Sequence, residues 1–128
     1  MRLIKLLMLT LLLFSYVYAE RWVHNAKLDA YEMFYDADSI QETKTGSTVT
    51  VKFVFSPAAA ESMKTKSGQV PAASICRNLY TKDRGVKSLE RVLVDKQGKV
   101  LEKVTPAMQP VPIMPGTPAD KMWQKLYK

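Results

Sequence analysis

The chain has 128 residues, a net charge of +7 and a single cysteine, Cys76. This length suits one domain, which can bury roughly 65% of its unfolded surface without a metal or a disulfide. A lone cysteine excludes a disulfide within the chain. We expect Cys76 to be either a buried apolar residue or a free thiol that pairs with another chain, which leaves a homodimer open.

Residues 1–19 have the pattern of a bacterial secretory signal peptide. Arg2 and Lys5 precede an apolar run over residues 6–19, and no acidic residue comes before Glu20. A membrane-spanning helix needs about 20 apolar residues, so this run is short for an uncleaved anchor, which is the alternative. We expect the chain to be exported and to meet a membrane only during export.

The predicted cleavage site lies between Ala19 and Glu20. Val17 and Ala19 occupy the −3 and −1 positions, where signal peptidase sites have small residues. No cysteine lies near this point, so lipid attachment is not expected there. The mature domain would be residues 20–128, located in the periplasm, at the cell surface or outside the cell.

Charge is uneven along this predicted domain. Residues 20–75 carry a net charge of −1 and residues 76–128 carry +6, which gives +5 for the domain. The basic half favours contacts with acidic glycans or anionic lipid. The alternative is a solvated surface whose charge keeps the protein soluble.

The mature chain is predicted to consist mostly of strands. The clearest is 48–55, where Val49, Val51, Phe53 and Phe55 alternate with polar or smaller residues and share one face. The expected strands are 21–28 and 31–35 (a hairpin), 48–55, 73–82, 86–94 and 99–104. They are short, closely spaced and not separated by helices, so we expect one antiparallel sheet of about six strands.

The segments between these strands carry turn and loop signals. Asp and Ser in 36–40 predict a turn, and Gly98 in 95–98 predicts a hairpin loop. Residues 56–72 read as a long loop around a helical turn at 59–64, and loops of this length are usually mobile or functional. Four of the seven prolines fall in 105–116, which predicts an extended connector that cannot join a β-ladder.

A helix is predicted at the C-terminal end. Thr117 can cap it, Pro118 suits its first position, and Asp120 complements the helix dipole. Its apolar residues form one stripe at helical spacing: Ala119, Met122, Trp123, Leu126 and Tyr127. A helix this short is marginal alone, so the stripe must dock on the sheet. The fold class is therefore α+β, a single antiparallel sheet with the helix packed on one face.

The sequence offers little for catalysis. It has one histidine, His24, one cysteine and no glycine-rich phosphate loop, and it assembles no zinc-ligand pattern. Asp29, Asp36 and Asp38 lack the glycine and terminal glutamate of a calcium loop. We expect a protein without catalytic, cofactor-binding or metal-binding residues, and thus no cofactor; an unrecognised hydrolase is the alternative.

A basic-aromatic stretch runs from the end of the predicted strand 73–82 into the strand 86–94 and contains Tyr80, Lys82, Arg84, Lys87 and Arg91. Strand surfaces of this kind bind single-stranded nucleic acid. Export argues against a nucleic-acid partner, so sulfated glycans or anionic lipid head groups are the polyanions that this stretch would meet.

Motifs across nearly all of the mature chain resemble the surface-adhesin protein E family of exported bacterial proteins. They are Arg21-Trp-Val23, Tyr35-Asp-Ala-Asp-Ser-Ile40, Thr48-Val-Thr-Val-Lys52, Leu79-Tyr80, Asp95-Lys-Gln-Gly-Lys-Val100 and Val111-Pro-Ile-Met-Pro-Gly-Thr-Pro118 followed by Trp123. The resemblance implies a twisted antiparallel sheet with the C-terminal helix on its concave face. It also implies adhesion to host matrix proteins such as vitronectin and laminin, and to plasminogen, through residues 64–80.

The chain departs from that family in its cysteines. Members often carry one in the mid-chain strand and another just after the helix tryptophan, which would tie the helix to the sheet. Here Asp83 or Arg84 and Tyr127 occupy those places. On this comparison the helix would be docked by Met122, Trp123 and Leu126 alone, and their burial would replace about 2–4 kcal/mol of disulfide stabilisation.

The leading functional hypothesis is a non-enzymatic, exported protein E-like domain that binds a macromolecular partner. Its surface would comprise Lys64, Lys66, Arg77, Tyr80, Lys82, Arg84 and Lys87. The alternative is a periplasmic structural or regulatory module that binds a cell-envelope component without adhesion. A third hypothesis is a small-ligand carrier with a groove between sheet and helix, lined by Met122 and Trp123, where plain core is the competing interpretation.

Overall fold

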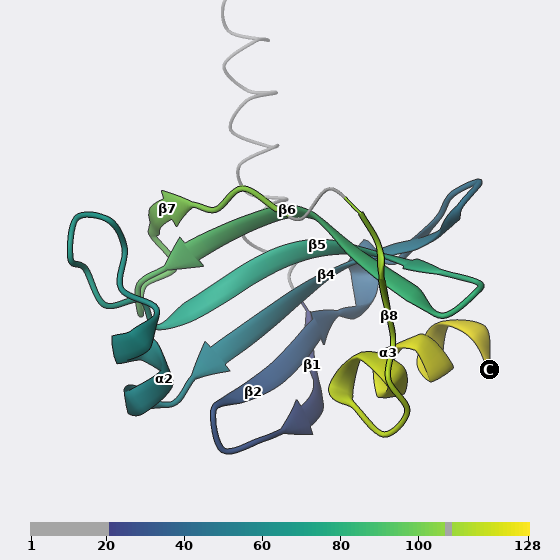
Figure 1. The fold of residues 1–128 in the computed structure, drawn as a ribbon, viewed down its shortest axis with the longest axis horizontal. Coiled ribbons are helices and arrows are strands. Elements are labelled where there is room, and N and C mark those ends of the chain that lie inside the picture. Colours follow the sequence, from purple (N-terminus) through teal and green to yellow (C-terminus); the bar gives the residue numbers. More distant parts are fainter. Residues whose placement is uncertain (1–20, 107–108) are drawn as a thin grey trace, which may run out of the picture.

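The structure is a computed structural model that describes residues 21–106 and 109–128 (Figure 1). The predicted signal peptide and the cleavage site at Ala19 and Glu20 lie outside the described residues.

One antiparallel sheet forms the body of the protein. Its strands are ordered β1-β2-β4-β5-β6-β7, and each pairs antiparallel with its neighbours. Their bounds are β1 Trp22–Lys27, β2 Tyr31–Asp36, β4 Gly46–Phe55, β5 Ala73–Thr81, β6 Gly85–Val94 and β7 Val100–Lys103. Two-residue strands add to the margins: β3 (Gln41–Glu42) pairs with β4, and β8 (Val111–Pro112) pairs with β6. The predicted fold class is confirmed.

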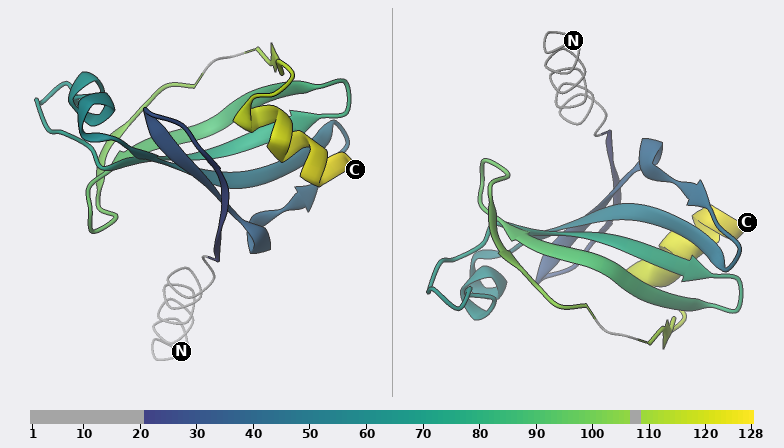
Figure 2. Two further views of the ribbon diagram at one scale, coloured as in Figure 1. Left: turned by 90° about the horizontal axis from the view of Figure 1, so that it is seen from below. Right: turned by 90° about the horizontal axis from the view of Figure 1, so that it is seen from above.

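The period-two pattern separates the two faces of this sheet. Val51 lies opposite Cys76 on β5, and Cys76 lies opposite Arg91 on β6, so these side chains share a face. We call it the helix face, because α3 (Pro118–Tyr127) lies across it (Figure 2). The core cluster on this face consists of Met33, Val49, Val51, Cys76, Tyr80, Ile113, Met122 and Trp123.

Local capping explains the shorter elements. The Asp36 carboxylate accepts from the Asp38 N–H at 3.0 Å and opens the 3-10 turn η1 (Ala37–Ser39). Helix α2 spans Pro57–Ser62, and the Ser56 hydroxyl accepts from the Ala59 N–H at 3.2 Å. The helix therefore begins two residues before the predicted turn at 59–64, because a serine cap followed by proline favours a start at that point.

The proline-rich segment differs from its prediction. Val111 pairs with Val86 and Pro112 with Gly85, so β8 joins the sheet that these prolines were expected to avoid. Proline is tolerated in a two-residue strand at the margin of a sheet, because the ladder does not need its missing N–H there. The Ile113 N–H then donates to the Arg84 carbonyl at 2.8 Å, and the buried Ile113 side chain joins the core.

Helix α3 docks through its predicted stripe. Met122 is fully buried, Trp123 is 9% exposed, and Leu126 packs against the same cluster. At the helix start, the Thr117 hydroxyl accepts from the Asp120 N–H at 3.2 Å. Ten residues of α-helix extend for about 15 Å. The helix is therefore too short to cover the whole helix face of a sheet with strands of nine and ten residues.

Polar contacts hold α3 as well, so the expectation of docking by three apolar side chains alone is wrong. The Trp123 indole N–H donates to the Thr81 carbonyl at 2.8 Å, and the Tyr127 hydroxyl donates to the Tyr80 carbonyl at 2.7 Å. Arg84 pairs with Asp120 at 2.9 Å, and its guanidinium lies 4.3 Å from the centre of the Trp123 ring. Arg84 and Tyr127 thus both link helix to sheet.

Candidate ligand groove

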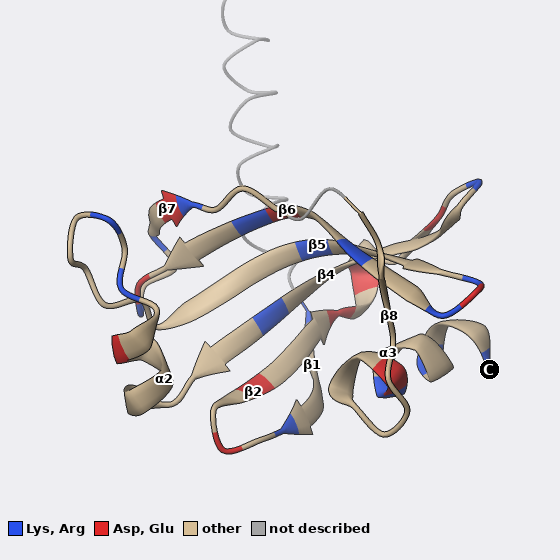
Figure 3. Ribbon diagram, in the orientation of Figure 1, with Lys and Arg blue, Asp and Glu red and all other residues tan. Residues whose placement is uncertain are grey.

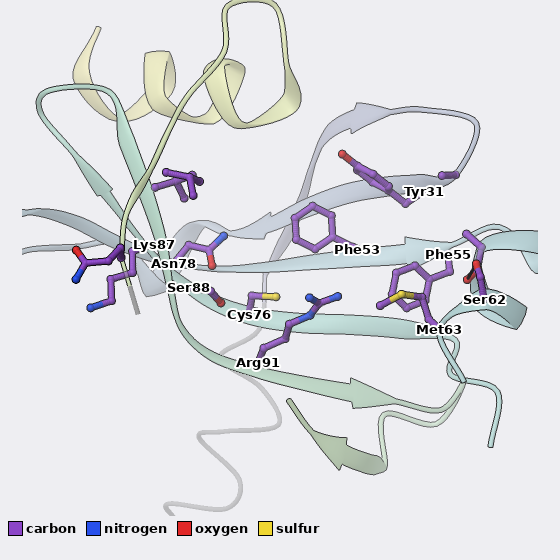
Figure 4. Close-up of a pocket in the computed structure, with 15 residues that line it drawn as sticks. Tyr31, Phe53, Phe55, Ser62, Met63, Cys76, Asn78, Lys87, Ser88 and Arg91 are labelled. Atoms are coloured by element: carbon purple, nitrogen blue, oxygen red, sulfur yellow. Dashed lines mark hydrogen bonds between the residues drawn. The ribbon is translucent and has the colours of Figure 1, made fainter. Parts of the chain in front are cut away.

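A groove of about 520 Å³ remains on the helix face, beside α3 (Figure 4). Its floor comes from β2, β4, β5 and β6, and α2 closes one end of it. The rim opposite β2 includes Val111 of β8. The groove exists because strands β4, β5 and β6 continue past the part of the helix face that α3 covers.

The floor of the groove is largely apolar and includes three aromatic rings. The alternation in β4 directs Phe53 and Phe55 to this face, and Tyr31 lies opposite Phe55 on β2. The rings of Tyr31 and Phe53 meet edge to face with centroids 5.1 Å apart. Met63, which follows α2, adds a thioether to the same wall. These side chains are only partly buried, so apolar residues on the core-facing side of the strands remain accessible to a ligand.

Arg91 provides a cation within the groove. It is half-buried on β6, and its Nε–H donates to the hydroxyl of Ser74, a fully buried residue, at 3.0 Å. Within the described part of the chain, Arg91 takes part in none of the ion pairs, whereas Arg77 pairs with Glu90 and Arg84 with Asp120. The lining of the groove contains no acidic residue among those described.

Two buried polar side chains lie next to Arg91. Burial raises the pKa of the Cys76 thiol, and the Ser74 hydroxyl and the Arg91 charge oppose that effect only in part. The thiol therefore stays protonated at neutral pH. Asn78 is 8% exposed, and its amide oxygen has no hydrogen-bond partner among the described residues. Buried amides rarely lack a partner, so Asn78 leaves the groove with an unsatisfied polar group.

The structure distributes the predicted partner-binding residues over the segment after α2, the sheet, the β5–β6 turn and the core. Lys and Arg in general are spread over the ribbon and do not form one patch (Figure 3). Lys64 and Lys66 lie after α2, where Lys64 pairs with Glu61 at 2.7 Å. Arg77 points to the other face of the sheet from Cys76, its neighbour on β5. Lys82 is exposed in the β5–β6 turn.

The other predicted residues have different surroundings. Tyr80 is 1% exposed and belongs to the core cluster, so its ring is not accessible to a partner. Arg84 is engaged with Asp120 and Trp123. Lys87 borders the groove, but it lies opposite Leu79, so its side chain points to the same face as Arg77. The carrier hypothesis placed its ligand at Met122 and Trp123, but both are buried core, and the open space lies beside the helix.

Sequence reasoning assigned Phe53 and Phe55 to the core face and Arg91 to a basic stretch, but it did not combine them. It did not single out Tyr31, Met63 or Asn78. The missed signal was a length mismatch. A helix of about 15 Å cannot cover six strands spaced about 4.8 Å apart, so part of an apolar face had to stay open.

Other site types are not represented in the described residues. No cluster of three or more His, Cys, Asp or Glu side chains in residues 21–106 and 109–128 could hold a metal ion. Over the same ranges, every helix lacks the length or the apolar character needed to cross a membrane. Comparison of the chain with protein-family models, with curated proteins and with solved structures gives no match. Function is therefore inferred from the groove itself.

Proposed function

We propose that this chain is a non-enzymatic, exported bacterial envelope protein that binds an apolar ligand in the groove on the helix face. The observation that carries the proposal is the open aromatic floor formed by Tyr31, Phe53 and Phe55. An exposed apolar surface of this kind is costly in water and typically marks a binding site. Its volume of about 520 Å³ lies in the range of about 300–1,000 Å³ that small-molecule sites occupy.

The chemistry of the groove supports binding over catalysis. Its one thiol, Cys76, is kept protonated by burial and is a weak nucleophile in that form. The single histidine, His24, lies on β1 beside Glu32 and is not among the groove's lining residues. Export rests on the charged, apolar and small-residue pattern of residues 1–19. The ligand would accordingly be a component of the cell envelope or its surroundings.

The experiment is a titration with N-phenyl-1-naphthylamine, a neutral fluorophore that brightens in apolar sites. Ala59 lines the groove, whereas Ala58 is exposed one position earlier on α2, so the two form a matched pair. Ala59→Trp should fill the groove and weaken binding by about tenfold or more, while Ala58→Trp should bind as the parent does. Absence of binding by the parent, or equal binding by both variants, would refute the proposal.

Adhesion to host matrix proteins is the second candidate, and it rests on the resemblance to the protein E family. The observation that favours it is that Lys66, Lys82 and Lys87 make no ion pair within the described residues. Such cations can contact a polyanionic partner in a salt-sensitive way.

The test for adhesion is binding to immobilised vitronectin and laminin over a salt series. The Lys82→Ala/Lys87→Ala double variant should bind more weakly and lose part of the salt dependence. Arg84 is left in place because its replacement would disturb α3. Surface labelling of intact cells is the decisive companion measurement, since a protein protected until the outer membrane is permeabilised cannot reach a host matrix.

A further inference from the structure

We propose that the groove selects single-chain anionic amphiphiles, with the acyl chain on the aromatic floor and the acidic head group on Arg91. This inference rests on the proposed function and names its ligand class. The two parts of such a ligand match the two parts of the groove: Tyr31, Phe53, Phe55 and Met63 are apolar, and Arg91 is cationic.

The geometry of Arg91 is the first support. Its Nε–H is committed to Ser74, but its terminal N–H groups have no acceptor among the described residues. Figure 4 shows the side chain extending from β6 into the groove next to Cys76. A guanidinium in this position presents a planar pair of donors, which fits a carboxylate or phosphate in two parallel hydrogen bonds.

The electrostatics of the groove point the same way. A half-buried cation on an apolar surface loses hydration, and a bound anion would compensate for that loss. Lys87 borders the groove, but it lies opposite Leu79, so its side chain points to the other face, and none of the described lining residues is acidic. Arg77 and Arg84, in contrast, already have carboxylate partners at 3.8 and 2.9 Å. Arg91 is therefore the arginine of this sheet that is available to an anionic ligand.

Asn78 gives an independent indication of a polar head group. Its buried amide oxygen lacks a hydrogen-bond partner in the described structure, and its Nδ2–H reaches only the Tyr80 hydroxyl, at 3.5 Å. The residue lines the groove next to Ser88, and Figure 4 places Cys76 between it and the Arg91 guanidinium. A head group that extends from Arg91 past Cys76 would thus meet further unsatisfied hydrogen-bonding capacity.

The test compares dodecanoate with dodecanol, which have equal chain lengths but differ in charge. Each competes with N-phenyl-1-naphthylamine in the parent, in Arg91→Gln and in Arg77→Gln, whose arginine lies on the opposite face. The parent should prefer dodecanoate by about tenfold or more, because hydrogen bonds to charged groups are strong. Arg91→Gln should lose this preference while still binding the fluorophore, and Arg77→Gln should keep it.

A lysophosphatidylglycerol arm tests a phosphate head group against the free fatty acid. Competition with the fluorophore by either ligand that is lost in Arg91→Gln supports the proposal and identifies the source of the acyl chain.

The outcomes separate this inference from the proposed function. If the fluorophore binds and Ala59→Trp blocks it, but dodecanoate and dodecanol compete equally in the parent, the groove binds apolar ligands and the Arg91 inference is refuted. Retention of the preference for dodecanoate in Arg91→Gln refutes it as well, provided that the variant unfolds cooperatively. If no probe binds the parent, both proposals fail.

Discussion

Replacing Trp123 with phenylalanine tests how α3 is held on the sheet. The indole is 9% exposed, its N–H donates to the Thr81 carbonyl at 2.8 Å, and the Arg84 guanidinium lies 4.3 Å from the ring centre. Trp123→Phe keeps an aromatic ring in the core. It removes the hydrogen bond, weakens the contact with the cation and leaves part of the indole volume empty.

The loss of stability in Trp123→Phe can be divided among these contacts. The hydrogen bond contributes about 1 kcal/mol, and the Thr81 carbonyl loses its indole donor. The weaker cation–π contact costs about 0.5 kcal/mol. The smaller ring forfeits about 1 kcal/mol of apolar burial. We therefore expect Trp123→Phe to lower the free energy of unfolding by about 2–3 kcal/mol, which lowers the thermal midpoint by about 10 °C in a domain of this size.

The assay is thermal and urea unfolding of the chain from Glu20 onward, followed by far-UV circular dichroism. Trp22→Phe is the matched control, because Trp22 is the other tryptophan of the chain and contacts Lys52 on the opposite face of the sheet. It should cost less than about 1 kcal/mol. If Trp123→Phe is as stable as Trp22→Phe, the polar and cationic contacts of Trp123 do not hold α3, and this account of its docking is wrong.

Three further predictions concern other contacts. The Gly116 N–H holds the pKa of Asp120 below its usual value, so the stability from this carboxylate is present above about pH 4 and lost as pH falls through the folded-state pKa. In urea unfolding, Asp120→Asn should therefore lose less stability than the parent as pH falls. An unchanged pH profile would contradict this. Gly46→Ala places a Cβ against the Tyr80 carbonyl oxygen, closer than real Cβ atoms approach, and should cost about 1–3 kcal/mol. Gly68→Ala should cost less, because nothing lies within 4 Å of its Cβ and only a φ of +84° opposes alanine. The reverse order of urea midpoints would refute that reasoning. Burial raises the pKa of Tyr80 to about 12, so the stability that its protonated hydroxyl contributes is complete below the unfolded-state pKa of about 10 and declines as pH rises toward 12. Tyr80→Phe should therefore lose less stability than the parent at alkaline pH, as followed by circular dichroism. An identical alkaline loss in both proteins would argue against this.

Elements with local causes could be predicted from the sequence. The alternation over Val49, Val51 and Phe53 depends only on the pleat of one strand, and β4 has the predicted faces. The Thr117 cap and Pro118 set the start of α3 through neighbouring residues, and the helix begins where they predict. Strand spacing without intervening helices predicted the antiparallel order, because short connections join adjacent strands.

Features that depend on distant partners could not be predicted in this way. Pro112 reads as a connector residue until the chain folds back and places it beside Gly85. Arg84 reads as a free surface cation, but Asp120, 36 residues later, removes it from the available charges. Tyr80 reads as part of a basic-aromatic surface, and only α3 packing over its end of the sheet buries it.

The sequence by itself determined the strands, the helix stripe and the apolar face on which they meet, because periodicity and capping act over a few residues. Only the tertiary structure decided how much of that face the helix covers. The uncovered part, with the aromatic floor and Arg91, follows from the length of α3 relative to the sheet and from where α2 and β8 lie. Those are relations between segments far apart in the chain, and no local pattern contains them.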